Sequence, residues 1–332
     1  MVKEICVLEP SECRHISISL YRPITKSGDP RFWISNFKRC AQGDDVCAIF
    51  AHSQSLYILN LTRFDLAKVL STQLQSEIAR FLNGLKNNKN AIALELLGKL
   101  KALAAKGPLK SVCAGDTSVG RTIETALEIE INSRPDPDYH GIEIKSGRSQ
   151  LLQRQTRASL FACVPNWSLS TYKGSGAILN RFGYARDDDF KLYCTVSTGR
   201  NNSQGLRLKF DEVTHWLREI YNGTPPENVC IWELAVLHAK LASKHKETFW
   251  VKADKIQIGG HDYFDLVSVL HTTTPSSEQF DRLIQDGSIT VDHLIKRTPA
   301  GGAHEKGPLF KIEKPRISEL FLGESKRYSL LS

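Results

Sequence analysis

The sequence of 332 residues lacks the features that would place it in several large classes of proteins. No stretch reaches the ~18 consecutive apolar residues that a membrane-spanning helix requires, so we expect no membrane partner. The first ten residues include Glu4 and Glu9 and no long apolar run, which is unlike a secretory signal peptide. No internal repeat or low-complexity tract is present. These absences favour a globular protein of the cytoplasm.

The cysteines also lack the spacing of a metal-binding motif. No two of them form a Cys-x-x-Cys pair, which argues against a zinc ribbon. Because the chain shows no secretory signal, disulfides are not expected either. We expect reduced, mostly buried thiols at all eight cysteines: Cys6, Cys13, Cys40, Cys47, Cys113, Cys163, Cys194 and Cys230.

Length and composition fit one large globular domain or two smaller ones. Hydrophobic residues make up 41% of the chain and charged residues 24%, so the chain can bury a sizeable core. The formal net charge of +8 and the pI of about 9.0 permit binding to a polyanion. Charge alone does not establish such a partner, because many basic proteins bind no nucleic acid.

The first part of the chain shows short strand patterns separated by turn residues. The expected strands cover residues 5–8, 16–21, 32–36, 46–52 and 55–61. Apolar residues at three- and four-residue steps then predict a helix over 64–85. The run Asn87-Asn88-Lys89-Asn90 should break this helix, and a second helix should cover 91–105. We therefore place a domain boundary between residues 87 and 88.

The most informative stretch is a turn followed by a short strand that ends at Lys145. Side chains alternate between the two faces of a strand, so Ile142 and Ile144 share one face while Glu143 and Lys145 share the other. Asp138 lies at the turn and can reach back toward the same point. Two carboxylates and an ammonium should therefore converge beside this strand.

Such a group of side chains can hold a divalent metal ion and a phosphate. Mg²⁺ prefers carboxylate and carbonyl oxygens, so its predicted ligands are Asp138, Glu143 and Ile144. A bound metal lowers the pKa of a water molecule and neutralises charge on a phosphate. A solvated strand also alternates isoleucine with charged residues, and the triplet alone leaves that alternative open.

A glycine-rich turn and a helix precede this strand. The turn matches the spacing of a phosphate-binding P-loop, but Arg121 replaces the lysine and no clear buried strand comes before it. We interpret it as a turn that opens a helix over 120–131. Glu124 and Glu128 lie four residues apart on that helix. Glu124 belongs either to a solvated face or, as a third carboxylate, to the metal site.

Basic residues in loops follow the central strand. Arg148, Lys173 and Arg181 stand near glycine and aromatic residues, a composition that suits contact with a phosphate backbone. Further strands are expected at 190–197, 206–210, 229–232, 248–251, 289–295 and 309–312, and further helices at 232–245 and 276–286. This alternation predicts an α/β or α+β fold with a mixed sheet flanked by helices.

Several motifs in the same order resemble one enzyme family. The stretches 115–124, 137–145, 180–184, 286–292 and 303–310 are similar to the MvaI/BcnI family of type II restriction endonucleases, relatives of the MutH mismatch-repair nickase. The resemblance covers roughly residues 88 to 325. It implies a PD-(D/E)xK nuclease core and Mg²⁺-dependent hydrolysis of double-stranded DNA. It also implies a role in restriction–modification or phage defence, with the monomeric action that the family often shows.

The resemblance assigns roles to the residues that match the motifs. Asp138 and Glu143 would be metal ligands, Lys145 would position or stabilise the attacking hydroxide, and Glu124 would be a helix carboxylate at the edge of the site. Where the family often has a second histidine in a loop that faces DNA, this chain has a lysine, which leaves the base specificity open. The expected DNA contacts are His140, Arg148, Lys173, Arg181, His304 and Lys306. His140 is expected at the turn or on a phosphate rather than as a general base.

Two alternatives remain beside a site-specific endonuclease. Residues 1–87 do not match the minimal family enzymes, so they are expected to form an accessory domain for DNA recognition or regulation, followed by a nuclease domain at 88–332. The first alternative is a modification-dependent or repair-type nickase. The second is a DNA-binding protein that has lost cleavage, against which the intact Asp138, Glu143 and Lys145 argue.

Overall fold

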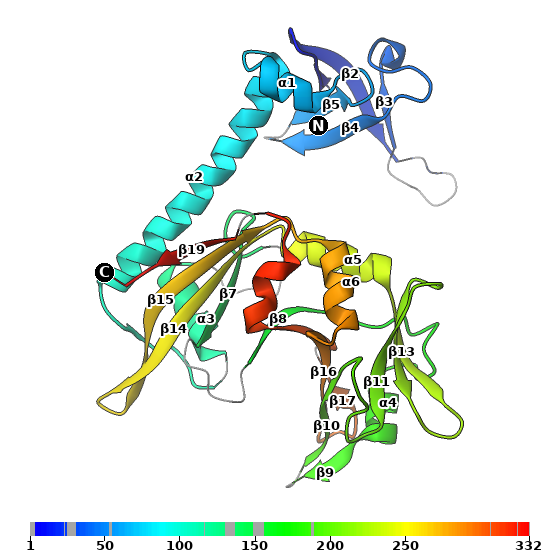
Figure 1. Ribbon diagram of the computed structural model, residues 1–332, viewed down its shortest axis with the longest axis vertical. Coiled ribbons are helices and arrows are strands. Elements are labelled where there is room, and N and C mark those ends of the chain that lie inside the picture. The colour runs from blue at the N-terminus through cyan, green and yellow to red at the C-terminus, as the bar shows by residue number, and fades with distance from the viewer. Residues whose placement is uncertain are drawn as a thin grey trace. The chain divides into compact units, whose positions relative to one another are not determined.

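The computed structural model divides the chain into two compact units, Met1–Leu94 and Glu95–Ser332. Each unit is described here by itself, with the elements labelled in Figure 1. The structure describes residues 4–22, 24, 31–52, 55–115, 117–129, 137–148, 156–186, 189–305, 307–323 and 325–331, and only the main chain at 88–90.

The N-terminal unit is built on a five-stranded sheet of order β3-β2-β1-β5-β4. Its strands are β1 (Glu4–Leu8), β2 (Cys13–Tyr21), β3 (Arg31–Ile34), β4 (Cys47–His52) and β5 (Ser55–Asn60). The central strand β1 is buried on both faces, because Ile5 and Val7 enter one apolar cluster while Cys6 and Leu8 enter another. Val69 of α1 (Leu66–Thr72) joins the second cluster. The expected strand-rich character of this unit is confirmed.

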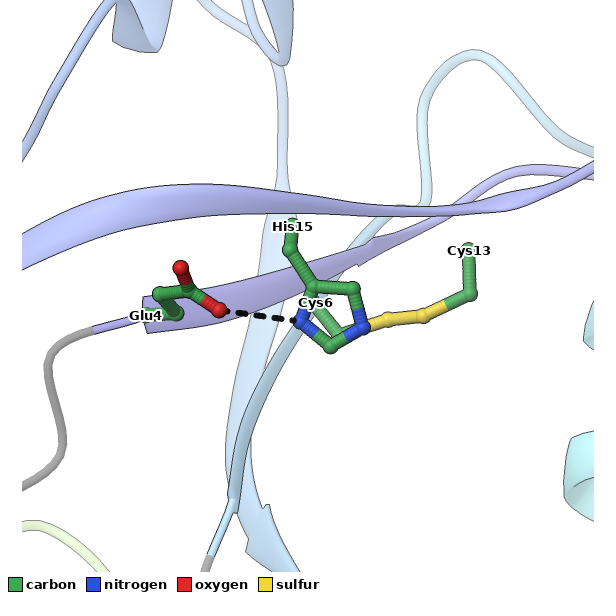
Figure 2. Close-up of a disulfide and its surroundings, with 4 residues drawn as sticks. All are labelled: Glu4, Cys6, Cys13 and His15. Carbon is green, nitrogen blue, oxygen red and sulfur yellow. Dashed lines mark ion pairs between the residues drawn. A yellow bond between two sulfur atoms is a disulfide. The ribbon is translucent and has the colours of Figure 1, made fainter.

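The expectation that every cysteine is a free thiol is wrong at one pair. Cys6 and Cys13 are joined by a disulfide, which Figure 2 shows beside Glu4 and His15. The antiparallel pairing of β1 with β2 places their Cα atoms 5.9 Å apart, within the range that a disulfide spans. Sequence spacing alone could not reveal this pairing, because it depends on the register of two strands.

The predicted helices at the end of this unit are also wrong in their boundaries. The first, α1, ends at Thr72, whereas α2 (Glu77–Ala105) continues through the asparagine-rich run that was expected to break it. The side chain of Asp65 accepts a hydrogen bond from the backbone of Lys68 and so caps α1. An interior asparagine costs only about 0.7 kcal/mol relative to alanine, too little to end a long helix.

The C-terminal unit contains the motif strand in a mixed sheet of order β19-β15-β14-β7, with β6 paired to β15. The motif strand β7 (Glu143–Arg148) runs parallel to β14 (Glu247–Ile258). β14 forms a long antiparallel hairpin with β15 (His261–Thr273), drawn in yellow and gold in Figure 1. The remaining strands are β6 (Leu109–Lys110) and β19 (Lys326–Ser329). β7 thus lies at one end of this strand order, beside the β14–β15 hairpin.

A second sheet has the order β8-β18-β16-β10-β9, with β17 paired to β16, and β11-β12-β13 form a third. The bounds are β8 (Arg157–Ala162), β9 (Tyr184–Arg186), β10 (Asp189–Val196), β11 (Leu206–Asp211), β12 (Trp216–Tyr221), β13 (Glu227–Glu233), β16 (Ile289–Arg297), β17 (Ala303–His304) and β18 (Leu309–Glu313). The helices are α3 (Ser118–Ala126), α4 (Ser175–Phe182), α5 (Leu234–Lys244) and α6 (Ser277–Gln285), with short 3-10 helices at Phe37–Arg39 and Lys314–Leu320.

One large apolar core joins these elements. It includes Phe161 of β8, Trp232 of β13, Leu237 of α5, Phe280 of α6 and Phe310 of β18, all nearly inaccessible to solvent. The predicted mixed α+β fold is therefore confirmed. Among the helices of the described ranges, none combines the length and apolar character that crossing a bilayer demands.

Candidate active site

The motif strand begins after a tight turn that returns the chain on itself. Tyr139 and Ile142 exchange backbone hydrogen bonds of 2.9 and 2.8 Å across two residues with positive φ, His140 at 45° and Gly141 at 94°. Two positive φ values in succession are typical of a type I′ turn. The turn brings Asp138 back to the strand, where its Oδ2 accepts a 2.8 Å hydrogen bond from the backbone N–H of Ile144.

Glu143 is the most enclosed charged side chain of the motif. Only 1% of its side chain is exposed, so the alternative of a solvated strand is wrong. Its Oε1 lies 2.5 Å from Nζ of Lys145, and its Oε2 accepts a hydrogen bond from Nζ of Lys244 at 3.2 Å. A buried carboxylate requires such compensation, because leaving it unpaired would cost several kcal/mol.

Lys244 is a site residue that the sequence did not reveal. It ends α5, and 101 residues separate it from Glu143 along the chain. The only local signal is a basic residue in the last turn of a helix, which is common because it complements the helix dipole. Its role at the site depends on the packing of α5, which the motif does not encode.

Glu124 joins the carboxylates of the motif through the packing of α3 on β7. Gly120 allows this approach, since a Cβ there would lie 3.2 Å from Oγ of Ser146 and 3.7 Å from Oε1 of Glu124. Burial and the nearby charge of Asp138 raise the pKa of Glu124. Glu124 is half-buried, which favours its place at the edge of the carboxylate group, although α3 itself is shorter than predicted.

The end of α3 explains why the predicted helix over 120–131 was too long. Glu128 has a φ of 58°, and two backbone bonds close the last turn, from Glu128 N–H to Thr125 O and from Ile129 N–H to Glu124 O. This is the Schellman arrangement that terminates helices. The residue at 131 lies outside the described ranges.

The electrostatics of the carboxylates favour a cation among them. Burial, followed by the charge of Glu143, raises the pKa of Asp138. The oxygens of Asp138, Glu143 and Glu124 and the carbonyl of Ile144 offer the hard ligands that Mg²⁺ prefers. The chemistry of the donor set therefore suits Mg²⁺, and in this structure the ammonium groups of Lys145 and Lys244 occupy the two oxygens of Glu143.

A basic cavity of about 380 Å³ lies against the same strand. Arg157 and Lys311 are held in its wall by Asp292, at N–O distances of 2.7 and 2.8 Å. Burial and the nearby charge of Lys252 lower the pKa of Lys314, which shows that cations are crowded here. The cations that line the cavity are Lys145, Arg148, Arg157, Lys252, Lys311 and Lys314. The cavity is therefore suited to an anion.

The other predicted contact residues are not gathered at this cavity. His140 is exposed in the turn before β7, and His304 is exposed on β17. Lys306 lies outside the described residues. Of the predicted DNA contacts that the structure describes, Arg148 alone is among the residues that line the cavity.

Lys173 and Arg181 are held by partners within the chain. The ammonium of Lys173 donates to three backbone carbonyls, those of Trp167, Ser168 and Ser170, at 2.6 to 3.2 Å. It has no N–H left for a phosphate in this conformation. The guanidinium of Arg181 lies 3.4 Å from Glu227 and stacks over the ring of Tyr221 at 4.9 Å. Both residues support the loop structure around α4.

The mixed sheet, with Glu143 and Lys145 on its motif strand, Asp138 in the turn before it and a basic cavity beside them, belongs to the restriction endonuclease class of folds. The model of the MvaI/BcnI restriction endonuclease family matches residues 97–321, and the chain belongs to this family. The chain is accordingly a DNA endonuclease by family, and the predicted resemblance and restriction-endonuclease-like fold are confirmed.

Two solved structures are similar to the chain. The complex of restriction endonuclease MvaI with its cognate DNA substrate has a TM-score of 0.61 and 22% sequence identity, over 72% of this chain and 98% of that one. MvaI in the absence of DNA has a TM-score of 0.42 and 20% identity, over 71% and 97% of the two chains. No curated protein sequence matches the chain.

Proposed function

We propose that the chain is a Mg²⁺-dependent, sequence-specific endonuclease that hydrolyses both strands of double-stranded DNA, as a type II restriction enzyme of a restriction–modification or phage-defence system. The observation that carries the proposal is the enclosure of Glu143 between Lys145 and Lys244, next to the raised-pKa carboxyl of Asp138. Such an arrangement contributes little to stability, and charged clusters of this kind are typical of catalytic sites.

The proposed ligands of the metal are Asp138, Glu143 and the backbone carbonyl of Ile144, with Glu124 at the edge of the site. A bound Mg²⁺ would supply Lewis acidity for the phosphate and a water molecule of lowered pKa. Lys145 shares the strand with Glu143 and lines the basic cavity, so its ammonium can stabilise charge that develops on the phosphate. Lys244 holds Glu143 in position and balances its charge.

DNA is the proposed partner. The similar MvaI structure is a complex with a cognate DNA substrate. In this chain the basic cavity would receive the phosphate backbone, which dominates the affinity of proteins for DNA. His304 and Lys306 remain the proposed base-reading residues, and Arg148 and His140 the proposed phosphate contacts.

Plasmid digestion tests this proposal. Supercoiled DNA, methylated or unmethylated, is incubated with the full chain in Mg²⁺ and in EDTA, and the product ends are sequenced. We expect linear products with a common end sequence in Mg²⁺, none in EDTA, and none with Glu143→Gln. Glu212→Gln changes an exposed carboxylate and serves as the matched control. Products with random ends, or full cleavage by Glu143→Gln, would refute the proposal.

The same digestion separates the two alternatives. A repair-type or modification-dependent nickase would convert the plasmid to nicked circles, or would cut only the methylated form. A DNA-binding protein without cleavage would shift the DNA in a gel and leave it supercoiled in Mg²⁺. The strand-rich N-terminal unit lies outside the residues matched by the family model. Recognition of a modified base by this unit is the reason to include methylated DNA in the test.

A further inference from the structure

We propose that Glu219, Cys230 and His293 form a structural zinc site inside the C-terminal unit, with Glu305 orienting the histidine. One ligand atom from each of the three residues lies within 4.8 Å of the other two. All three are fully buried, at 0% exposure. The cluster is separate from the motif strand and from the cations that line the basic cavity.

Two cross-strand pairs from different sheets build this cluster. Glu219 of β12 stands opposite Cys230 of β13, in the three-stranded sheet. His293 of β16 stands opposite Cys194 of β10, in the other sheet. The register of β12 shifts directly after Glu219, and such irregularities often aim a side chain at a site. A metal here would join the two sheets.

An unsatisfied oxygen points to a missing ligand. Oε2 of Glu219 lies 2.7 Å from Nε2 of His293, whereas Oε1 is buried and lacks a hydrogen-bond partner within the described ranges. A charged oxygen that is buried without a hydrogen-bond partner destabilises the folded state. A cation bound to Glu219 would remove this cost.

The surroundings of His293 match those of a metal-bound imidazole. Its Nε2 faces Glu219, and its Nδ1 lies 3.4 Å from Oε1 of Glu305, whose other oxygen accepts a hydrogen bond from the hydroxyl of Ser175. Metal-bound histidines almost always donate their second N–H to such a carboxylate, which fixes the ring and its tautomer. Glu305 therefore has the place of a positioning residue.

The donor types select zinc over the Mg²⁺ of the catalytic strand. A thiolate, an imidazole and a carboxylate are the usual ligands of Zn²⁺. At tetrahedral angles, Zn–N and Zn–O bonds of ~2.0–2.1 Å require about 3.3 Å between the two donor atoms, so Nε2 and Oε2, which now lie 2.7 Å apart, must separate by about 0.6 Å to admit the ion. Cys194 stands opposite His293 in the strand pair but outside this group of three mutually close ligand atoms.

The alternative is a metal-free ion triad. Burial by itself would lower the pKa of His293, but Glu219 and Glu305 outweigh burial and raise the pKa to about 10. An imidazolium would then lie between two carboxylates, and Cys230 would stay a protonated thiol, because burial and the neighbouring Glu219 raise its pKa. Zinc binding replaces two protons, one on the imidazolium and one on the thiol, so the charge of the buried cluster is the same in both states.

Metal analysis of the purified full chain separates the two states. We expect about one zinc per chain in the wild type after growth with added zinc, and at least a fivefold lower content in Cys230→Ser. Cys113→Ser alters a cysteine outside the cluster and should keep the metal. Asp138→Asn should keep the zinc as well. This variant removes a carboxylate of the motif site, so a loss of zinc from it would mean that the zinc is bound at that site instead. Zinc-free wild type, or equal zinc in Cys230→Ser, would overturn the proposal.

Cobalt substitution guards against a variant that simply misfolds. The wild type is stripped of metal and reconstituted with Co²⁺ alone, and its absorption spectrum is recorded beside circular dichroism as a check of folding. We expect a thiolate-to-cobalt charge-transfer band in the wild type and its loss in a folded Cys230→Ser variant. A wild type that shows no such band identifies the metal-free ion triad, and a folded variant that keeps the band unchanged shows that another cysteine binds the cobalt; either result overturns the proposal.

Discussion

At the scale of single residues, the site places a carboxylate where water cannot reach it and surrounds it with ammonium groups. Glu143 contacts both Lys145 and Lys244, while burial raises the pKa values of Asp138 and Glu124 despite the nearby charge of Lys145. The three ionised carboxylates therefore destabilise the folded state to different extents. Glu143 is compensated by the protein, and the other two become favourable only when a cation binds.

Lys145 is expected to be essential for cleavage. Lys145→Ala and Lys145→Arg should each lose about a hundredfold or more in the single-turnover rate, the scale observed when one electrostatic donor is removed. Arginine keeps the charge but is larger and planar. The side chain is 30% exposed, so both variants should fold. Lys209→Ala is an exposed control, and a near-normal rate for Lys145→Ala would remove this residue from the mechanism.

Asp138 should destabilise the metal-free protein at neutral pH. Its pKa in the folded state is raised by burial and by Glu143, so the ionised form is less favourable in the folded protein than in the unfolded one. Stability is then lost as pH rises from the unfolded pKa through the folded pKa. Asp138→Asn should abolish cleavage yet unfold at a higher temperature than the wild type in EDTA at pH 7. The difference should shrink in acid, and a lower melting temperature at pH 7 would contradict this account.

At the scale of elements, the structure shows which parts of the fold a sequence can predict. The strands and helices over 189–196, 206–211, 234–244, 277–285 and 289–297 were predicted closely, because their apolar periodicity is local. The chain reversal that returns Asp138 to β7 was also predicted. By contrast, only residues 248–251 of β14 were predicted and β15 was missed, since charged residues such as Asp254, Lys255 and Asp265 interrupt their apolar patterns.

The site was predictable only as far as it lies on one strand. Asp138, Glu143 and Lys145 are close in sequence, and their spacing carries their chemistry. Lys244 enters from a helix that precedes β14, and the cluster of Glu219, Cys230 and His293 comes from three separate strands. No local pattern marks these contacts, because they depend on how distant elements pack.

The end of α5 provides a test at this scale. His245 is buried, its Nε2–H donates to the carbonyl of Leu160, and its Nδ1 accepts from the hydroxyl of Thr248. This requires the neutral ring, and burial lowers its pKa to about 4 from 6.5. Stability should therefore be intact above pH 6.5 and should fall by on the order of 3 kcal/mol as pH drops toward 4.

Urea unfolding between pH 7 and pH 5 measures this effect. The wild type should lose stability over that range, whereas His245→Gln should lose less, although it starts from a lower value. His261→Gln changes an exposed histidine and should follow the wild type. Parallel pH profiles for the wild type and His245→Gln would show that another group sets the pH dependence.

At the scale of the whole molecule, a chain of net charge +8 gathers cations in one cavity beside the site. The same excess of positive charge does not mean that every basic residue meets DNA. Lys252 lines the cavity, whereas the three N–H groups of Lys173 donate hydrogen bonds to backbone carbonyls. The two lysines therefore form a matched pair for binding experiments.

DNA affinity should fall steeply between ~50 and ~200 mM salt, because phosphate contacts release counterions. Lys252→Ala should lower the slope of log affinity against log salt by about 1, the change expected for one lost phosphate contact. Lys173→Ala should leave the slope unchanged. Fluorescence anisotropy in Ca²⁺ or EDTA gives both slopes without cleavage. Equal slopes for Lys252→Ala and wild type would place the DNA path outside the cavity.

At the tight turn of His140 and Gly141, the site depends more on the number of residues in the turn than on which residues they are. Oδ2 of Asp138 meets the N–H of Ile144 because two residues, no more and no fewer, separate Tyr139 from Ile142. Exchange of the exposed His140 for asparagine, which tolerates positive φ, should be accepted there. A single inserted or deleted residue would shift the strand by one position. The side chains that now point into the core would then point toward the site, and those of the site would point into the core. Variation among functional relatives should therefore appear here as substitutions, and almost never as insertions or deletions.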